Sequence, residues 1–499
     1  MYLYLVVLLF FVIYYVTKVR SSRLYEVVFQ YPPCRKELPF LGSFYHFLYA
    51  SSKHAMKLIT DIGYQTMEAG GIARLYTFNT YYLVMTDASE IAEALTLYLN
   101  KDYMYTFLQA ITSNGSVFTP EASKSKVRRR VLLPSFTSKM MAGYVESIWA
   151  ESVALAESLA PFVGKGPFAA GPYLGAFCFN SILRSADAQD LRKEMCTLQL
   201  LDDFHRCLKL VYERWVSLWM YPNWVHRFTA NYAETHKNFV AFQNYSETAY
   251  RIRRNKLLSN STSNSTGDPS EEKNTKRGLF DGLLDSKLPQ IDVREEIVVL
   301  MGASEEAGIA LGFALMLMGQ YPEVQDKIYE ELRDIFDNSD RPLEIDDLKR
   351  LRYLDMVVKE VFRLYPPVPM IMRSADREIK LSSGRVVPAG AGIMVPIISL
   401  HRNPAYWGSD AYHFDPERFL PERLAVVSVN AYIPFSYGAR GCVGSKYGSY
   451  LVKLALCAIL RKYKVLGTPA SGPIPDIEIK FEVTLKSINN FEIEFVNRI

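Results

Sequence analysis

The sequence predicts a mainly α-helical protein with small β-sheets, preceded by one N-terminal transmembrane helix. Three observations predict this fold class. The first 17 residues carry no charged side chain, and segments 72–76 and 82–86 are short and rich in strand-forming residues. Helical patterns dominate most of the remaining chain, including a long apolar run from 291 to 321.

Composition narrows the class of protein. A net charge of +4 over 499 residues is small, so no nucleic-acid partner is implied. Six cysteines without paired spacing indicate reduced thiols on a cytosol-facing protein. They are Cys34, Cys178, Cys196, Cys207, Cys442 and Cys457. No CxxC or HExxH pattern argues for a zinc site.

The N-terminal segment MYLYLVVLLFFVIYYVT is predicted to be an uncleaved membrane anchor that occupies residues 1–20. As a helix it spans roughly 25 Å, the short end of the range for a membrane helix. A cleaved signal peptide is the alternative, but the segment lacks a positively charged start and a small-residue cleavage site. Lys18, Arg20 and Arg23 follow it, so the positive-inside rule places the rest of the chain in the cytoplasm.

Residues 21–50 are predicted to be a proline-rich hinge between this anchor and a catalytic domain over residues 51–499. Prolines fix their own φ angles and bias the preceding residues toward extended backbone, which makes a stiff spacer. An ordinary proline-rich loop is the alternative. Within the domain, residues 259–278 contain the polar run SNSTSNSTGDPSEEKNTK and are predicted to form a mobile surface loop, because they hold too little apolar surface to order themselves.

The most restrictive motif of the chain is Phe-x-x-Gly-x-Arg-x-Cys-x-Gly, which begins at Phe435, contains Cys442 and ends at Gly444. Each residue type in it suits a haem whose iron is bound by a thiolate, a soft ligand that favours O–O cleavage. Gly438 and Gly444 let the backbone approach a flat porphyrin and direct amide N–H groups at the sulfur. Arg440 can pair with a haem propionate, and Phe435 can cover the sulfur side of the ring. A buried structural thiol is the alternative for a lone cysteine, but the full pattern favours haem.

This motif matches the cysteine-loop signature of the cytochrome P450 superfamily. Its continuation Ser-Lys-Tyr-Gly at 445–448 resembles the microsomal branch that includes fatty-acid ω-hydroxylases and many insect members, although Gly448 stands where that branch usually has alanine. The resemblance covers essentially the whole chain in the right order. It implies the cytochrome P450 fold, haem b as the cofactor and Cys442 as the axial ligand of the haem iron.

The same resemblance implies two further arginines as haem contacts. Segment 124–136 resembles the family's helix that ends in Pro-x-Phe, and counting back from Pro134 puts Arg129 at the position that usually binds a propionate. Ser125 takes the place of a tryptophan found in most relatives. Arg373, on the strand that borders the substrate pocket, is also implied to bind a propionate.

Two segments are predicted to meet partners. Five cations lie between Lys124 and Arg130, which is either a solvated basic face or a docking surface for an acidic reductase, since complementary charge raises encounter rates. Residues 190–255 are rich in aromatic side chains. The resemblance implies that they form the helical lid over the substrate, with membrane contact or ordinary core packing as the alternatives.

The predicted apolar helix over 291–321 contains two adjacent carboxylates, and burying charge is costly. The simplest interpretation is that one or both face solvent. In the family the matching helix crosses the oxygen-binding face of the haem and carries an acidic residue followed by threonine. Alignment from Tyr321 places Glu305 on the acidic residue, as a proton relay, and Glu306 on the threonine, whereas a slip of one residue would place Glu305 there. We expect a desolvated Glu306 to have a raised pKa and to donate a proton during oxygen activation.

A structural network is implied behind the haem. Glu360 and Arg363 lie three residues apart and share one helix face. With Arg418 of a Pro-Glu-Arg-Phe segment they resemble the family's buried Glu-x-x-Arg network. A buried glutamate between two arginines loses several kcal/mol when one partner is removed, whereas an exposed pair contributes little. We therefore predict that Glu360→Ala or Arg363→Ala yields apoprotein or aggregate.

The sequence thus predicts an enzyme, a membrane-anchored haem-thiolate monooxygenase that hydroxylates a lipophilic substrate. Electrons are expected from NADPH through a flavoprotein reductase, with cytochrome b5 as an optional second donor. The expected location is the endoplasmic reticulum membrane, with the catalytic domain facing the cytosol. The pocket residues that can be named are apolar, so fatty acids, hydrocarbons, steroids and xenobiotics all stay open as substrates. Two alternatives also stay open: a reductase-independent haem-thiolate isomerase or dehydratase of oxygenated lipids, suggested by the missing threonine, and a non-catalytic haem protein that binds lipophiles.

Overall fold

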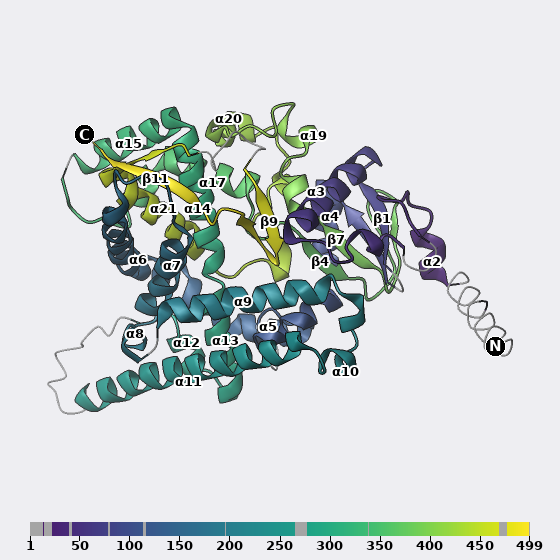
Figure 1. Ribbon diagram of the computed structural model, residues 1–499, viewed down its shortest axis with the longest axis horizontal. Helices are drawn as coiled ribbons and strands as arrows, with labels where there is room; N and C mark the ends of the chain where they lie inside the picture. The colour runs from purple at the N-terminus through teal and green to yellow at the C-terminus, as the bar shows by residue number, and fades with distance from the viewer. Residues whose placement is uncertain are drawn as a thin grey trace.

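The computed structural model describes residues 22–38, 42–77, 80–112, 116–194, 196–264, 277–337, 339–468 and 477–498, together with Ile13. Helices make up most of the described chain, and four small sheets accompany them (Figure 1). The predicted mainly helical fold class is therefore confirmed. Apart from Ile13, the residues of the predicted membrane anchor lie outside the described ones.

The longer helices form the body of the protein. They are α3 (Ser52–Glu68), α5 (Ala122–Leu132), α6 (Ser138–Leu159), α7 (Gly171–Ser185), α9 (Thr197–Trp215), α11 (Ala230–Asn264), α13 (Gln290–Gly302), α14 (Glu305–Gln320), α15 (Pro322–Phe336), α17 (Arg352–Leu364) and α21 (Ser445–Lys462). The shorter helices are α2 (Arg23–Val28), α4 (Ala88–Leu97), α8 (Leu191–Glu194), α10 (Asn223–His226), α12 (Asp281–Leu284), α16 (Asp347–Arg350), α18 (Ile397–Leu400), α19 (Pro404–Trp407) and α20 (Pro421–Leu424). Short 3-10 turns are η1 (Phe44–His46), η2 (Tyr103–Ala110), η3 (Leu133–Phe136), η4 (Ala160–Phe162), η5 (Leu218–Met220), η6 (Pro416–Phe419), η7 (Val429–Ala431) and η8 (Gly438–Arg440).

The largest sheet has the strand order β1-β2-β7-β4. β1 (Ile72–Thr77) and β2 (Thr80–Met85) pair antiparallel, as their residues predicted; β7 (Gly392–Val395) joins β2 in parallel, and β4 (Ile371–Ser374) joins β7 antiparallel. The smaller sheets are β5 (Ile379–Lys380) with β6 (Val386–Val387), β9 (Ile479–Glu482) with β10 (Thr484–Ser487), and β3 (Phe168–Ala169) with β11 (Glu492–Asn497) and β8 (Tyr463–Leu466). The two turns after β5 and β6 use Gly384 and Gly390 at φ +88° and +85°, a backbone region that glycine enters without strain.

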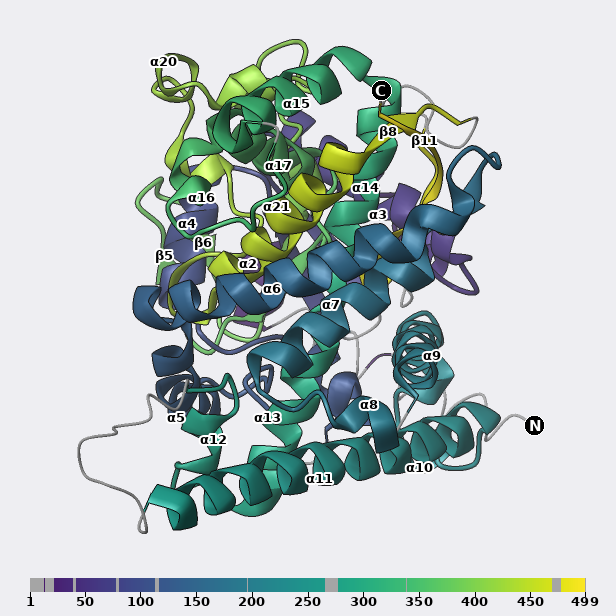
Figure 2. The same ribbon diagram turned by 90° about the vertical axis from the view of Figure 1, so that its left-hand side faces the viewer.

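The core of the helical body surrounds α14, which contacts α7, α17 and α21 and the strand β8 (Figure 2). Among the described residues, the run Gln290–Gln320 is the one helical stretch long and apolar enough to cross a membrane. However, 89% of its most apolar window is buried inside the protein. Packing against neighbouring helices therefore accounts for its hydrophobicity.

The predicted long helix is interrupted at residues 303–304, which separate α13 from α14. The lid helix α9 packs at this break, and a Cβ added to Gly302 would lie 2.3 Å from the ring of Phe204 on α9. Gly302 therefore lets α9 approach α13 closely. α9 packs against α11 at one edge of the molecule, and the two helices cross at an angle, since Figure 2 shows α9 end-on and α11 along its length.

The described part of the predicted hinge is bonded to the largest sheet. The Cys34 N–H donates to the carbonyl of Arg74 at 3.0 Å, and the Arg74 N–H donates to the carbonyl of Pro32 at 2.8 Å. The guanidinium of Arg74 pairs with Glu37 at 2.9 Å. Extended, proline-biased backbone leaves N–H and C=O groups that can add to a sheet edge. The predicted spacer is thus part of the globular domain, and the predicted boundary at residue 51 is not seen.

The predicted surface loop over 259–278 also differs from the structure. Helix α11 continues through 259–264, and residues 265–276 lie outside the described ones. Extending an existing helix through serine or asparagine costs only about 0.5 kcal/mol per residue, so a polar composition alone does not end a helix.

Candidate active site

The loop that carries Cys442 lies between η8 and α21. The Cys442 N–H donates to the carbonyl of Phe435 at 2.9 Å, and the Gly441 N–H donates to the carbonyl of Gly438 at 3.0 Å. Gly438 has φ +71°, and a Cβ at this position would also lie 3.3 Å from the carbonyl oxygen of Leu95. The glycine-rich motif therefore folds as a tight turn that holds the cysteine in a fixed position.

Two observations together indicate that the thiol of Cys442 faces a hollow enclosed by protein. Its side chain is accessible, whereas Cys178 and Cys457 are buried. Burial nevertheless raises the pKa of the Cys442 thiol to about 11, against a hydrogen bond from the backbone of Gly444 that lowers it. A side chain is both accessible and surrounded when it faces an internal hollow. Cys442 is therefore not a thiol packed into the core.

Four cations gather around this hollow, and three of them were predicted from the sequence: Arg129, Arg373 and Arg440. The fourth is Lys101, which bridges to the backbone of Arg373. Burial lowers the pKa of Arg440 to about 10, and repulsion from Arg373 and Arg129 adds to the effect. Burial and repulsion from the same arginines also lower the pKa of Lys101 well below its ordinary value. The four groups therefore repel one another in a shielded place.

These cations have no anionic partner in the described part of the chain; their contacts are mainly backbone carbonyls and aromatic rings. Arg129 donates to the carbonyl of Gly441 at 2.6 Å, and Arg440 donates to the carbonyls of Leu99 and Thr119 at 2.7 and 2.5 Å.

Arg373 and Lys101 are the least satisfied members of the group. Arg373 is 1% exposed, and its Nε has no hydrogen-bond partner among the described residues. The ammonium of Lys101 lies over the rings of Tyr105 and Phe118, at 4.7 and 4.8 Å from their centroids. Buried charges are costly unless they are paired, so this cluster fits a ligand that carries carboxylates at its edge.

The two adjacent carboxylates of the predicted apolar helix, Glu305 and Glu306, lie at the start of α14 and have opposite electrostatic environments. Glu305 is 5% exposed, and its Oε1 lies 3.0 Å from Lys486 Nζ on β10 and 2.9 Å from His205 Nε2 on α9. Burial alone would raise the pKa of Glu305, but Lys486 and His205 outweigh it and lower the pKa to about 2. Glu305 thus joins three elements as a fixed anion. This differs from the expected proton relay, because such a group does not exchange protons near neutral pH.

The environment of Glu306 is the opposite of that of Glu305. Burial and the adjacent charge of Glu305 raise its pKa to about 8. Its Oε2 is buried and has no hydrogen-bond partner in the described part of the protein. Glu306 is therefore mostly protonated at pH 7, next to a carboxylate that is not.

The predicted network behind the loop is present. Glu360 and Arg363 are both fully buried, and Arg363 donates to Glu360 from Nε at 2.6 Å and from Nη2 at 2.8 Å. Arg418 Nε lies 3.6 Å from Glu360 Oε1, but the closest carboxylate to Arg418 is that of Asp410, at 2.6 Å. Arg363 also donates to the carbonyl of Ala411 at 2.6 Å, so the network ties α17 to the segment that precedes the cysteine loop.

Comparison with known proteins agrees with this geometry. The family model described as Cytochrome P450 matches residues 32–495. The chain belongs to the cytochrome P450 family. Human Cytochrome P450 4V2 is 28% identical over 407 residues, which cover 78% of this chain and 74% of the relative. Cytochrome P450 4c21 of Blattella germanica is 26% identical over 473 residues (92% and 91%), and Probable cytochrome P450 313a3 of Drosophila melanogaster is 29% identical over 483 residues (95% of each).

Family membership makes this cytochrome P450 a haem-thiolate monooxygenase, an oxidoreductase. The predicted branch is confirmed as well, since relatives of family 4 occur in a mammal and in insects. The cofactor is haem, and the residues present fit it. Cys442 offers an accessible thiol, and the unpaired cations, with the orphaned Nε of Arg373, suit the two propionates.

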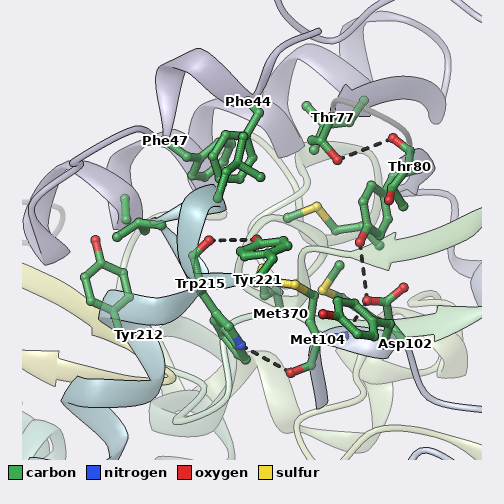
Figure 3. A pocket seen from close by; sticks show the side chains of 18 of the residues that line it. Phe44, Phe47, Thr77, Thr80, Asp102, Met104, Tyr212, Trp215, Tyr221 and Met370 are labelled. Atoms are coloured by element: carbon green, nitrogen blue, oxygen red, sulfur yellow. Dashed lines mark hydrogen bonds between the residues drawn. The ribbon is translucent and has the colours of Figure 1, made fainter. Parts of the chain in front are cut away.

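Beside the haem-binding hollow, this cytochrome P450 has a cavity of about 740 Å³. Most of its walls are apolar or aromatic and come from α3, the largest sheet, α9 and β9 (Figure 3). The cavity lies next to the cation cluster, because Met372 and Asp102 line the cavity while their neighbours Arg373 and Lys101 belong to the cluster. Trp215, Trp219 and Tyr221 of the predicted lid also line it, which supports the lid interpretation.

The exposed basic surface of α5 contains fewer cations than its sequence suggested. Arg128 is buried and pairs with Asp292 on α13 at 2.9 Å, and Arg129 is turned toward the cysteine loop. Lys124, Lys126 and Arg130 are exposed. Sequence spacing could not separate these two sets, because only the packing of α5 shows which face is inside.

Three residues of the site escaped the sequence analysis: Lys101, His205 and Lys486. None lies within a motif, and each reaches the site through a partner more than ninety positions away. A search of the sequence for cations near segment 124–136 would not have identified these three residues. Only the fold brings them together.

Proposed function

We propose that this cytochrome P450 inserts one oxygen atom from O2 into a lipophilic substrate, with electrons from NADPH delivered by a flavoprotein reductase. The observation that supports this proposal best is the accessible thiol of Cys442 beside four cations that lack carboxylate partners. Haem bound in this hollow would supply the oxygen-activating and electron-accepting chemistry.

The chain's own residues would bind and orient that group. Cys442 would ligate the iron, with the Gly444 backbone tuning the charge on sulfur. Arg129, Arg373 and Lys101 would pair with the propionates. Charge-assisted bonds of this kind are roughly twice as strong as neutral ones, so they would also fix the in-plane orientation.

Phe435 and Arg440 would complete the sulfur side. The ring of Phe435 packs against Phe362 of α17, with centroids 5.0 Å apart, which holds it in place beside the loop. Arg440 is anchored on backbone carbonyls on two sides, so it would contribute positive charge from a rigid position.

Glu306 would hold a transferable proton close enough to the site for its charge to act on the Cys442 thiol. Because its carboxyl is neutral at pH 7 and its Oε2 is unpartnered in the described structure, it can donate where threonine does in relatives. Glu305 would act as a positioning residue, since its fixed charge helps to keep the proton on Glu306.

The partners follow from the proposed chemistry and from the sequence. An N-terminal anchor over 1–20 would place the enzyme on the endoplasmic reticulum membrane, facing the cytosol. Lys124, Lys126 and Arg130 would meet the reductase, with cytochrome b5 as an optional second donor.

The test uses the full-length protein, purified in detergent and compared with Cys442→Ala. The wild type is expected to contain haem and to show the thiolate absorbance of the ferrous–carbonyl complex, and the variant is expected to lose that band. Turnover is then measured with reductase, with and without NADPH. Oxygenated product that requires NADPH supports the proposal, conversion without NADPH indicates an isomerase or dehydratase, and binding without conversion indicates a non-catalytic protein.

A further inference from the structure

Asp102 is the one acidic side chain among the described residues that line the 740 Å³ cavity, and no lysine, arginine or histidine lines it. Asp102 is 4% exposed. A single carboxylate in an otherwise apolar and aromatic wall decides which polar group the cavity can accept.

The carboxylate of Asp102 is held in place by the backbone. It caps the 3-10 helix η2, and its Oδ1 accepts from the Met104 N–H at 2.9 Å and from the Tyr82 hydroxyl at 3.3 Å. The backbone N–H of Tyr103 is a third donor to the same carboxylate. The side chain is therefore a fixed acceptor that cannot swing away from a ligand.

Lys101, which precedes Asp102 in the chain, and Arg214, which lies over the Phe107 ring of η2, are engaged elsewhere. The ammonium of Lys101 lies over two aromatic rings in the haem-side cluster. Arg214 of α9 donates to the carbonyls of Met220 and Tyr221 and to the side chain of Asn223. Neither residue lines the cavity. Burial raises the pKa of Asp102, whereas the hydrogen bonds from Met104, Tyr82 and Tyr103 lower it. When Asp102 is ionised, a substrate carboxylate in the cavity would meet a like charge, and no cation among the described lining residues would compensate it.

We propose that Asp102 makes the cavity select neutral lipophiles that carry a hydroxyl group over fatty-acid anions of the same chain length. A hydroxyl can donate to the carboxylate, while its chain packs on the apolar wall. A fatty-acid anion would lose its hydration and gain only repulsion. This inference rests on the proposed function, because it takes the cavity as the substrate site.

The test measures equilibrium binding of three probes that share one chain length: dodecan-1-ol, methyl dodecanoate and dodecanoate. Binding to the haem-loaded protein is followed by the spin-state absorbance of the iron, and independently by equilibrium dialysis of labelled probe. The alcohol is expected to bind most tightly, and the anion about tenfold or more weaker than the alcohol, as expected for like charges in a weakly screened site.

Asp102→Asn is the informative variant, because asparagine is an equally good helix cap and removes only the charge. The dodecanoate affinity is expected to rise about tenfold relative to methyl dodecanoate, whose own affinity should change less than about twofold. Tyr212→Phe serves as the control. Tyr212 lines the opposite side of the cavity, where its hydroxyl donates to the Ala50 carbonyl, so its loss should leave the acid-to-ester ratio unchanged (Figure 3).

Two results would overturn the inference: wild-type protein that binds dodecanoate more tightly than the alcohol, or an unchanged acid-to-ester ratio in Asp102→Asn. A variant that merely damages the fold would weaken all three probes together, which also counts against the inference. Failure of the proposed function can be told apart from failure of this inference. Protein without haem, or without the thiolate absorbance, would contradict the proposed function, whereas equilibrium dialysis would still measure the selectivity of the cavity.

Discussion

Replacing Glu360 by alanine is the sharpest test of how the cysteine loop is supported. Glu360 is fully buried and accepts from Arg363 Nε at 2.6 Å, from Arg363 Nη2 at 2.8 Å and from the Asp415 N–H at 2.9 Å. Arg418 Nε lies 3.6 Å away with no other hydrogen-bond partner in the described residues. The substitution therefore removes three hydrogen bonds and the carboxylate that pairs with Arg363, while Arg418 keeps its pair with Asp410.

The magnitude follows from the burial of the pair. Breaking a fully buried ion pair by removing one partner costs about 3–5 kcal/mol, and the orphaned Asp415 N–H adds about 1–3 kcal/mol. A loss of roughly 5 kcal/mol is a large share of the 5–15 kcal/mol that typically holds a folded protein together. We therefore expect apoprotein or aggregate, rather than a folded enzyme with a lower rate.

The assay compares haem per polypeptide and the melting temperature of the soluble fraction for Glu360→Ala and Glu417→Ala. Glu417 is a matched control because its carboxylate also forms an ion pair, with Lys327 at 2.6 Å. This pair lies on the surface, where the Glu417 side chain is 44% exposed. Its loss should cost less than about 1 kcal/mol. A Glu360→Ala protein with wild-type haem content and an unshifted melting temperature would refute the reasoning.

The remaining predictions concern charged groups around the site. Arg373→Met should lower haem retention during gel filtration because a buried propionate partner is lost, whereas Lys124→Met on the exposed face of α5 should not; equal retention in both would count against the cation cluster. Product formed per NADPH should fall as pH rises through about 8, where Glu306 loses its proton, and Glu306→Gln should give a low and flat profile. Lys486→Met should destabilise the protein by about 3–5 kcal/mol by leaving Glu305 short of a partner. The folded pKa of Glu305 is depressed to about 2, so the stability that this carboxylate contributes is present above its ordinary pKa and is lost as pH falls toward 2. The difference in melting temperature between wild type and Lys486→Met should therefore shrink in acid. A difference that is independent of pH would contradict this prediction.

Local patterns in the chain were enough to predict the elements whose physics is local. The strands β1 and β2, the helix α17 with a glutamate and an arginine on one face, and the glycine turn before Cys442 each depend on residues a few positions apart. Their spacing dictates which side chains share a face or a turn. The apolar run of α13 and α14 predicted one long helix, but the structure interrupts it at residues 303–304.

Tertiary structure alone decided which charges meet. Lys101 reaches Arg373, and Lys486 and His205 reach Glu305, across separations that no local pattern records. The adjacent carboxylates Glu305 and Glu306 look alike in the sequence. Nevertheless one has a pKa of about 2 and the other of about 8.

The sequence by itself therefore determined the family and the helical framework and predicted Cys442 as the haem ligand, because these follow from residue types at fixed spacing. The fold decided that the proline segment is bonded to the sheet, that Asp102 faces the cavity, and that Glu305 rather than Glu306 carries the charge. The physical reason is that a buried group's charge state depends on the sum of its desolvation and its partners, and those partners come from elements far apart in the chain.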